Sequence, residues 1–251
     1  MGLFGHGHTL RAAALACGMA WFGPITDLRA GTLDSPPTLQ VAGPSAEPFG
    51  LSVAAVYAGG LRDKWLGVAR KLDDERVQLA LCDGDRDNCA STAALQFLAI
   101  VDSGRARDGR ARLGEINRAI NLAIQPMSDL AQWGVPDRWS APLETFGTGR
   151  GDCEDYAIAK YVALTAAGVP ARDVKLVIVR NTAANEDHAI VAVRDGGDWI
   201  MLDNRWLTLV KDVAMPKTIP EFVLDDAGVR EFVPPAIAVA QRMPAPASVR
   251  F

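Results

Sequence analysis

Gly151-Asp152-Cys153-Glu154-Asp155-Tyr156 is the stretch of this chain that says most about its fold. It follows a Gly- and Thr-rich segment, residues 145–150, and it opens an apolar pattern with helical spacing. We therefore expect a helix over residues 152–167 with the cysteine in its first turn. The positive end of a helix dipole favours thiolate over thiol, so Cys153 is a candidate nucleophile.

Both neighbours of Cys153 are acidic, which is unusual for a cysteine that only fills a core. Adjacent carboxylates raise the pKa of a thiol, so a reactive Cys153 needs a cation to offset them. An imidazolium, the helix N-terminus or a bound metal ion are the available sources. Asp152, Glu154 and Asp155 carry the oxygen ligands that calcium prefers, although acids at a helix start also favour the dipole without any metal.

His188 and Asp203 follow Cys153 in the chain and supply the other groups of a thiol catalytic system. His188 precedes an alternating apolar run, and Asp203 ends another, with a turn at residues 195–198 between the two runs. If that turn closes a hairpin, the two side chains lie on neighbouring strands. The imidazole is then a candidate base, and the carboxylate fixes its orientation. The alternatives are a structural histidine at a strand start and an aspartate that begins a turn.

The composition is that of an ordinary globular protein. The chain has 251 residues, of which 49% are hydrophobic and 22% charged, and its formal net charge is -4. A negative chain without a basic, aromatic-rich stretch does not indicate a nucleic-acid partner. No apolar run is long enough to span a bilayer.

The two ends of the chain differ from its middle. Residues 1–30 carry a basic residue and a short apolar stretch typical of a secretory signal peptide, so we expect export to the periplasm. The alternative is an apolar N-terminal helix packed on the body. The apolar run before Cys17 is too short for a lipoprotein signal, so we expect no lipid anchor. Residues 31–50 are Pro- and Gly-rich and indicate a linker, leaving residues 51–251 as a single domain.

The cysteines fit an oxidising compartment. Cys82 and Cys89 flank a short polar turn that brings both sulfurs close, so we expect a disulfide. Cys17 leaves with the signal peptide. Cys153 then remains as a lone free thiol, for which catalysis is the economical explanation.

The hydrophobic periodicity predicts helices first and an antiparallel sheet after them, which is an α+β fold. The expected helices are residues 61–81, 90–101, 113–123 and 152–167, the second of them ending at the Ser-Gly-Arg sequence of residues 103–105. The expected strands are residues 174–180, 189–193, 199–202 and 206–210. Residues 128–148 are expected to form a loop, and the Pro-rich segment after Val213 an arm that wraps the domain.

Together these motifs resemble the bacterial transglutaminase-like cysteine peptidases. The resemblance rests on Trp139-Ser140-Ala141-Pro142-Leu143-Glu144-Thr145, on the Gly149–Tyr161 block, on His188-Ala189 and on Leu202-Asp203-Asn204, and it covers residues 110–210. It implies a papain-like, transglutaminase-like core with a triad of Cys153, His188 and Asp203.

The LapG-type branch of that family implies more. Its members need calcium, held by the acids that flank the cysteine, which are Asp152 and Glu154 here. They release large surface adhesins by proteolysis, which disperses biofilm, and an inner-membrane receptor sequesters them. The resemblance therefore implies an exported, calcium-dependent thiol endopeptidase whose substrate is a protein. The alternatives are a transglutaminase-like acyl transferase on the same fold and a catalytically idle, calcium-dependent binding module.

Overall fold

A computed structural model of the protein describes residues 47–234, all of which lie in the compact unit Ala42–Phe251. The expected signal peptide and most of the expected linker lie outside the described residues, as do residues 235–251. Residues 47–50, the end of the expected linker, already belong to the folded body. Phe49 donates its backbone N–H to Asp212 at 2.7 Å, and Pro48 is buried.

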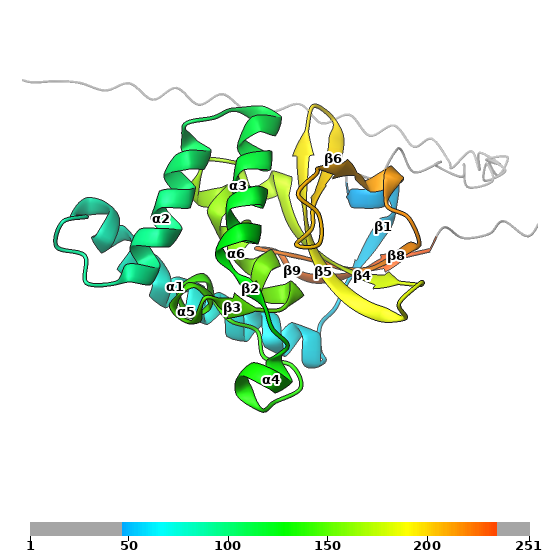
Figure 1. Ribbon diagram of the computed structural model, residues 1–251. Coiled ribbons are helices and arrows are strands. Elements are labelled where there is room, and N and C mark those ends of the chain that lie inside the picture. The colour runs from blue at the N-terminus through cyan, green and yellow to red at the C-terminus, as the bar shows by residue number, and fades with distance from the viewer. Residues whose placement is uncertain (1–46, 235–251) are drawn as a thin grey trace, which may run out of the picture. The chain divides into compact units, whose positions relative to one another are not determined.

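A helical layer lies on one side of a sheet (Figure 1). The helices in the described part of the chain are α1 Gly60–Gly84, α2 Thr92–Arg105, α3 Gly109–Ala123, α4 Asp129–Trp133, α5 Pro142–Thr148 and α6 Cys153–Ala166. The four longer helices confirm those expected from periodicity. The expected break at residues 103–105 is wrong, because α2 continues through Gly104, which is buried against Ile116 of α3.

The sheet has seven strands in the order β1-β9-β8-β4-β5-β6-β7, and all neighbours are antiparallel. The strands are β1 Ser52–Ala55, β4 Val174–Asn181, β5 Glu186–Asp195, β6 Asp198–Leu202, β7 Val210–Lys211, β8 Thr218–Asp225 and β9 Gly228–Val233. β2 Gln125–Pro126 and β3 Arg150–Gly151 form a small parallel pair, and β3 lies directly before α6. The α+β class is confirmed, with one edge strand, β1, coming before the helices.

The expected loop over residues 128–148 is wrong, because two short helices form there. Ser128 caps α4 by accepting the N–H of Ala131, and α5 begins at Pro142, where a missing N–H costs nothing. Gly134 and Gly149 end these helices in the left-handed conformation. The capping signals are therefore present in the sequence, but the helices are too short to show periodicity.

The C-terminal part of the expected strand pattern is also wrong. Residues 206–210 do not form a strand, since β7 begins only at Val210. The described part of the expected wrapping arm, up to residue 234, instead contains the β8–β9 hairpin, and β8 pairs with β4 in the middle of the sheet. Pro220 fits into β8 because the register with β4 shifts beside it, between Ile178 and Val179.

Helix α6 is the centre of the domain. It lies between α2 and α3 on one side and strands β4 and β5 on the other (Figure 1), and it is buried nearly all round. Its small residues Ala157, Ala159 and Ala163 are buried and permit close packing around the helix. A second apolar cluster fills the opposite face of the sheet, where Phe49, Leu51 and Met215 pack against it. This packing places the N-terminus of α6 beside β5, where the candidate site lies.

Candidate active site

Cys153 is the first residue of α6, as expected, and Asp152 precedes it as the N-cap residue. The chain enters the helix through Gly151, whose backbone lies directly against Asp155. A Cβ added at Gly151 would be 2.6 Å from Asp155 Oδ2, so only glycine fits there. Asp155 in turn accepts the backbone N–H of Ser140 at 2.8 Å, which fixes the segment leading into α5.

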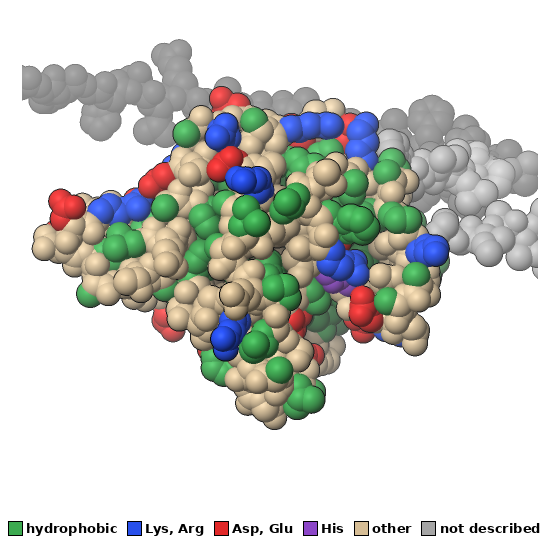
Figure 2. Space-filling model, viewed as in Figure 1, with side chains coloured by type: hydrophobic (Ala, Val, Ile, Leu, Met, Phe, Trp, Pro, Cys, Tyr) green, Lys and Arg blue, Asp and Glu red, His purple; other side chains and the backbone are tan. Residues whose placement is uncertain are grey.

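His188 and Asp203 form a buried pair. The hairpin expected between them is confirmed, since β5 and β6 pair up to Asp195 opposite Asp198. His188 Nε2 lies 2.9 Å from Asp203 Oδ1, and the two side chains are 5% and 1% exposed. Figure 2 shows the histidine as a small purple patch beneath a basic side chain and beside an acidic one.

The Asp203 carboxylate is held in its ionised form. Burial opposes ionisation, but the hydrogen bond and charge of His188 outweigh it, together with the backbone N–H and charge of Arg205. These interactions lower the pKa of Asp203 to about 2. A permanently ionised acceptor favours the tautomer of His188 that carries its proton on Nε2.

Cys153 and His188 line one cleft of about 460 Å³, together with Trp139, Asp187 and Ala189 among others. No hydrogen bond joins the thiol to His188 within residues 47–234. The thiol instead donates to Glu154 Oε2 at 3.2 Å. Since Nε2 of His188 is engaged by Asp203, Nδ1 is the ring nitrogen left for the thiol.

The thiol is protonated in this arrangement. Burial raises the pKa of Cys153 most, and the charges of Glu154 and Asp152 raise it further. A hydrogen bond from the backbone of Ala189 acts in the opposite direction. The acidic neighbours therefore oppose thiolate formation, as their sequence positions predict.

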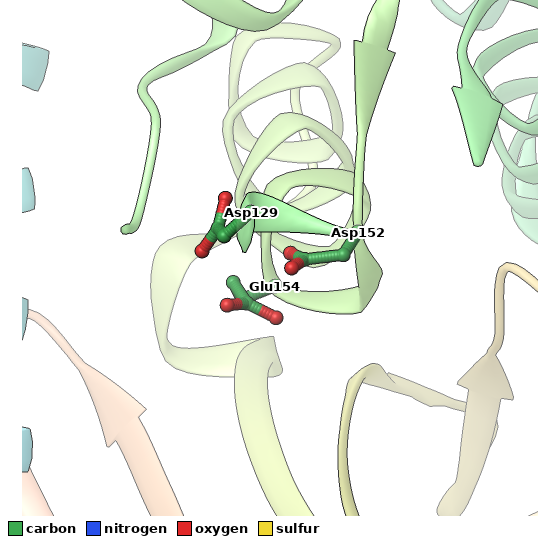
Figure 3. A group of neighbouring side chains, drawn as sticks. All are labelled: Asp129, Asp152 and Glu154. Carbon is green, nitrogen blue, oxygen red and sulfur yellow. The ribbon is translucent and has the colours of Figure 1, made fainter. Parts of the chain in front are cut away.

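Three carboxylates gather beside the nucleophile. Asp129, Asp152 and Glu154 each offer an oxygen, and these oxygens lie within 4.8 Å of one another (Figure 3). Burial raises the pKa of Asp152, and burial together with Asp152 raises that of Glu154 to about 8. Oδ1 of Asp129 and Oδ1 of Asp152 are buried without a hydrogen-bond partner in the described structure. An all-oxygen set with unpaired buried atoms fits a hard cation such as calcium.

The family follows from the sequence itself. Residues 77–215, more than half of the chain, match the bacterial transglutaminase-like cysteine proteinases. The chain belongs to this family. The match includes the expected core, residues 110–210, and extends it in the N-terminal direction through most of the helical layer. The protein is thus a transglutaminase-like cysteine peptidase, and its substrates are proteins.

Solved structures show the same fold. LapG of Legionella pneumophila is similar over 62% of this chain and 86% of its own, with 22% identity and a TM-score of 0.51. Its calcium-bound form matches over 59% of this chain and 84% of its own, also at 22% identity, with a TM-score of 0.50. Its EGTA-treated form gives 22% identity and a TM-score of 0.51 over 62% of this chain and 84% of its own. No curated protein matches the sequence.

The cysteine proteinase carries the expected disulfide between Cys82 and Cys89, and Cys153 is the free cysteine among the described residues. None of the helices in residues 47–234 has the length and apolar character that crossing a membrane requires.

Two residues of the site were not expected from the sequence. Asp129 lies in a segment read as a loop, and nothing local distinguishes it from an ordinary helix-start acid. Arg205 lies two residues after Asp203, and no motif of the sequence singles it out. It contacts Asp203, and that contact depends on how the chain leaves β6.

Proposed function

We propose that this peptidase is an exported, calcium-dependent thiol endopeptidase with Cys153 as nucleophile, His188 as base and Asp203 as the residue that orients the imidazole. The observation that carries the proposal is the buried His188–Asp203 pair at the cleft that Cys153 also lines. Nucleophile, base and orienting carboxylate are the parts that acyl transfer through a thioester needs.

The proposed reaction uses Nδ1 of His188 to take the thiol proton as Cys153 Sγ attacks the peptide carbonyl. The peptide C–N bond then breaks, the same proton goes to the leaving amine, and a thioester forms on Cys153. A water molecule gives a proton to His188 as its oxygen attacks the thioester carbon. The C–S bond then breaks, the acid leaves, and His188 returns the proton to Cys153 Sγ. Asp203 accepts from Nε2 throughout and keeps Nδ1 facing the thiol.

We propose that Asp129, Asp152 and Glu154 hold the calcium ion. The negative charges of Asp152 and Glu154 raise the pKa of the Cys153 thiol. Bound calcium would supply positive charge that offsets them. Two features of the structure support this proposal: the carboxylate oxygens lie close together, and two of them are buried without a hydrogen-bond partner in the described residues. In addition, a structural relative has been solved both with calcium and after EGTA treatment.

Calcium binding is tested by titrating the metal-stripped protein with calcium and following its thermal unfolding. The midpoint should rise with calcium in the wild type and in Asp137→Asn, a control at an acid that lines the same cleft outside the trio. It should stay flat in Asp129→Asn and Asp152→Asn. A calcium-dependent rise in these two variants would remove the proposed ligand set.

We further propose a periplasmic location, with residues 1–30 removed as a signal peptide. The disulfide supports an oxidising compartment. The substrate proposed from the family resemblance is a large cell-surface adhesin, and an inner-membrane receptor is proposed as a regulatory partner.

The peptidase proposal is tested by incubating the calcium-loaded protein with surface proteins of the same cell and reading the fragments by mass. The wild type should generate new termini, and Cys153→Ala should generate none. Cleavage by Cys153→Ala would refute the nucleophile. A labelled amine joined to the new C-terminus in place of water would show acyl transfer instead of hydrolysis.

A further inference from the structure

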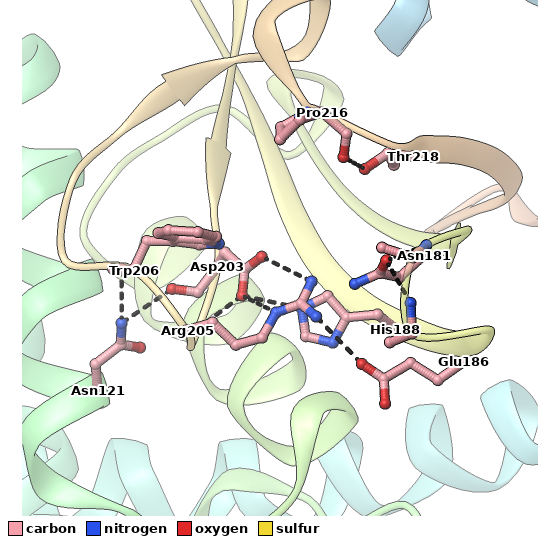
Figure 4. Close-up of polar contacts among 11 residues, drawn as sticks. Asn121, Asn181, Glu186, His188, Asp203, Arg205, Trp206, Pro216 and Thr218 are labelled. Carbon is pink, nitrogen blue, oxygen red and sulfur yellow. Dashed lines mark hydrogen bonds and ion pairs between the residues drawn. The ribbon is translucent and has the colours of Figure 1, made fainter.

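Arg205 connects the molecular surface to the buried His188–Asp203 pair. Its backbone N–H donates to Asp203 Oδ1 at 2.9 Å, its Nε lies 3.4 Å from the same oxygen and its Nη2 lies 3.4 Å from Oδ2. Its Nη1 lies 3.3 Å from Glu186 Oε1. Figure 4 shows the guanidinium between the carboxylates of Asp203 and Glu186, with the His188 ring on the same side of Asp203.

We propose that Arg205 is a positioning residue of the catalytic site, which holds the Asp203 carboxylate against His188 and is itself held by Glu186. This inference rests on the proposed function, because it assigns Arg205 a task within the proposed triad.

The end of β6 explains why Asp203 needs such a support. The pairing of β6 with β5 ends at Leu202, so Asp203 lies just beyond the ladder that would otherwise fix its backbone. Asn121 donates to its carbonyl oxygen at 2.9 Å, which anchors the main chain but not the carboxylate. A guanidinium that meets both carboxylate oxygens restricts rotation of the side chain in a way that a single hydrogen bond does not.

Arg205 also supplies a dependable positive charge near this buried anion. Besides His188 and Arg205, Lys160 of α6, which is 1% exposed, also interacts with Asp203. Burial lowers the pKa of Lys160 to about 7 even though the charge of Asp203 acts in the opposite direction. Arg205 therefore contributes to the compensation of Asp203 together with His188, and it does so from the side that faces Glu186.

The effect of Arg205 should appear in turnover and not in substrate binding. Arg205 does not line the cleft that contains Cys153 and His188. It lines a separate cavity of about 440 Å³, together with Trp206 and Met215. A residue that acts only through Asp203 should therefore change kcat and leave KM nearly constant.

The experiment compares Arg205→Gln with Arg110→Gln, a control that removes an exposed arginine paired with Asp195 and Asp198 at the far end of the same hairpin. Arg205→Gln should lower kcat by about 10- to 100-fold with KM within about 3-fold, since charge-assisted hydrogen bonds are lost. Arg110→Gln should match the wild type within about 2-fold. An Arg205→Gln enzyme with wild-type kcat would overturn the inference.

A double-mutant cycle with Asp203→Asn tests whether Arg205 acts through that carboxylate. In the Asp203→Asn background the same arginine change should cost less than about 3-fold, because the group that it positions is already gone. An undiminished loss in that background would show that Arg205 acts by another route and would overturn the inference.

A spectroscopic readout separates this inference from the proposed function. His188 is the histidine of residues 47–234, and its Nε2 proton, shared with Asp203, should give a slowly exchanging NMR signal. The signal should persist in Arg110→Gln and disappear in Arg205→Gln. It should weaken in Glu186→Gln, because this variant removes the charge of the half-exposed carboxylate that pairs with Arg205. A wild-type protein without peptidase activity would refute the proposed function. The positioning role has a separate test: it would be refuted if the NMR signal were unchanged in both Glu186→Gln and Arg205→Gln.

Discussion

Asp203 is the residue at which the polar contacts of the site converge. It accepts from His188 and from Arg205, and these interactions outweigh its burial and lower its pKa to about 2. An anion this deeply buried is stable only because it is paired, so each of its partners has a structural reason to stay in place. The carboxylate is therefore an ionised, fixed acceptor for Nε2 of His188 over the whole neutral range.

Asp203→Asn should lower kcat by roughly 10²- to 10⁴-fold while the protein stays folded. The amide keeps the shape of the carboxylate but loses its charge, and its NH₂ group turned toward the ring favours the tautomer with the proton on Nδ1. Steady-state kinetics checks the rate, and circular dichroism checks the fold. A folded variant with the kcat of the wild type would contradict the role given to Asp203.

For the candidate site, the sequence predicts the residues more readily than it predicts their contacts. Cys153, His188 and Asp203 stand out because of their order and because of the elements that they begin or end. Asp129 and Arg205 do not stand out, since an acid at a helix start and an arginine in a turn are common. Asp129 lies beside Asp152, and Arg205 beside Asp203, only because the chain folds back on itself, and no local sequence pattern predicts these contacts.

At the scale of elements, Gly104 shows how α2, α3 and α6 pack. A Cβ at this position would lie 2.6 Å from Ile116 Cδ1, 2.8 Å from Ile116 Cγ1 and 3.3 Å from Ala167 Cβ. Ile116 is fully buried and has no room to move away. The glycine therefore permits close helix contact, although glycine alone weakens a helix.

Gly104→Ala should lower the free energy of unfolding by about 1–2 kcal/mol, because overpacking costs more than the alanine gains in helix propensity. Gly114→Ala is the control, since its added Cβ would meet only Leu209 Cδ1 at 3.9 Å. Urea unfolding should show the control to be as stable as the wild type or more so. Equal stabilities of the two variants would contradict this packing.

Glu75 of α1 caps the start of α5. Both of its carboxylate oxygens lie 3.0 Å from the backbone N of Leu143, where α5 has no capping side chain of its own. Burial raises the pKa of Glu75 to about 7, and the hydrogen bonds from α5 only partly oppose the rise. The folded state thus binds the proton of Glu75 more tightly than the unfolded chain does.

The sign of the resulting pH dependence is opposite to that of Asp203. As pH rises from the ordinary pKa of a glutamate to about 7, the unfolded chain loses this proton first, so the free energy of unfolding falls. Between about pH 5 and about pH 7.5 the wild type should lose about 1 kcal/mol relative to Glu75→Gln. Urea unfolding of both proteins at the two pH values measures the difference, and parallel pH dependences would contradict it.

The elements that periodicity predicts are the ones long enough to show it. Helices α1 and α6 and strands β4 and β6 are predicted close to their observed limits. Helix α3 begins earlier than residue 113, at Gly109, and β5 extends beyond the expected residues 189–193 to Glu186–Asp195. The short helices α4 and α5 hold too few turns to show an apolar stripe. The β8–β9 hairpin is not evident in the sequence because Pro220 suggests an irregular arm. The irregularity that accommodates this proline, an additional residue in β8 opposite Ile178 and Val179 of β4, depends on the pairing of the two strands.

At the scale of the whole molecule, the disulfide closes the turn between α1 and α2 outside the catalytic cleft. Cys82 and Cys89 are separated by seven residues in sequence, and neither lines the cleft of Cys153. Ion pairs from Arg86 to Asp83 and Asp102 hold the same region. We therefore expect this end of the helical layer to contribute to the stability of the fold but not to the catalytic reaction.

Replacing Cys82 and Cys89 together by serine should lower the free energy of unfolding by about 2 kcal/mol, as expected for a short cross-linked loop. The calcium-loaded variant should keep the kcat of the wild type at a temperature at which it is folded. Guanidinium unfolding and steady-state kinetics measure the two quantities. A large loss of kcat in the folded variant would contradict the separation of the disulfide from the site.

The helical layer and the sheet together create the site, since α6 supplies the thiol and the β5–β6 hairpin supplies the imidazole and carboxylate. We propose that these parts act together as one nucleophile system. The most direct measurement is the rate at which iodoacetamide alkylates Cys153 in the calcium-loaded protein at neutral pH, followed by the mass of its peptide. His188→Ala should slow this rate by about 10-fold or more, while Arg110→Gln should leave it unchanged. A His188→Ala protein that is alkylated as fast as the wild type would contradict the account.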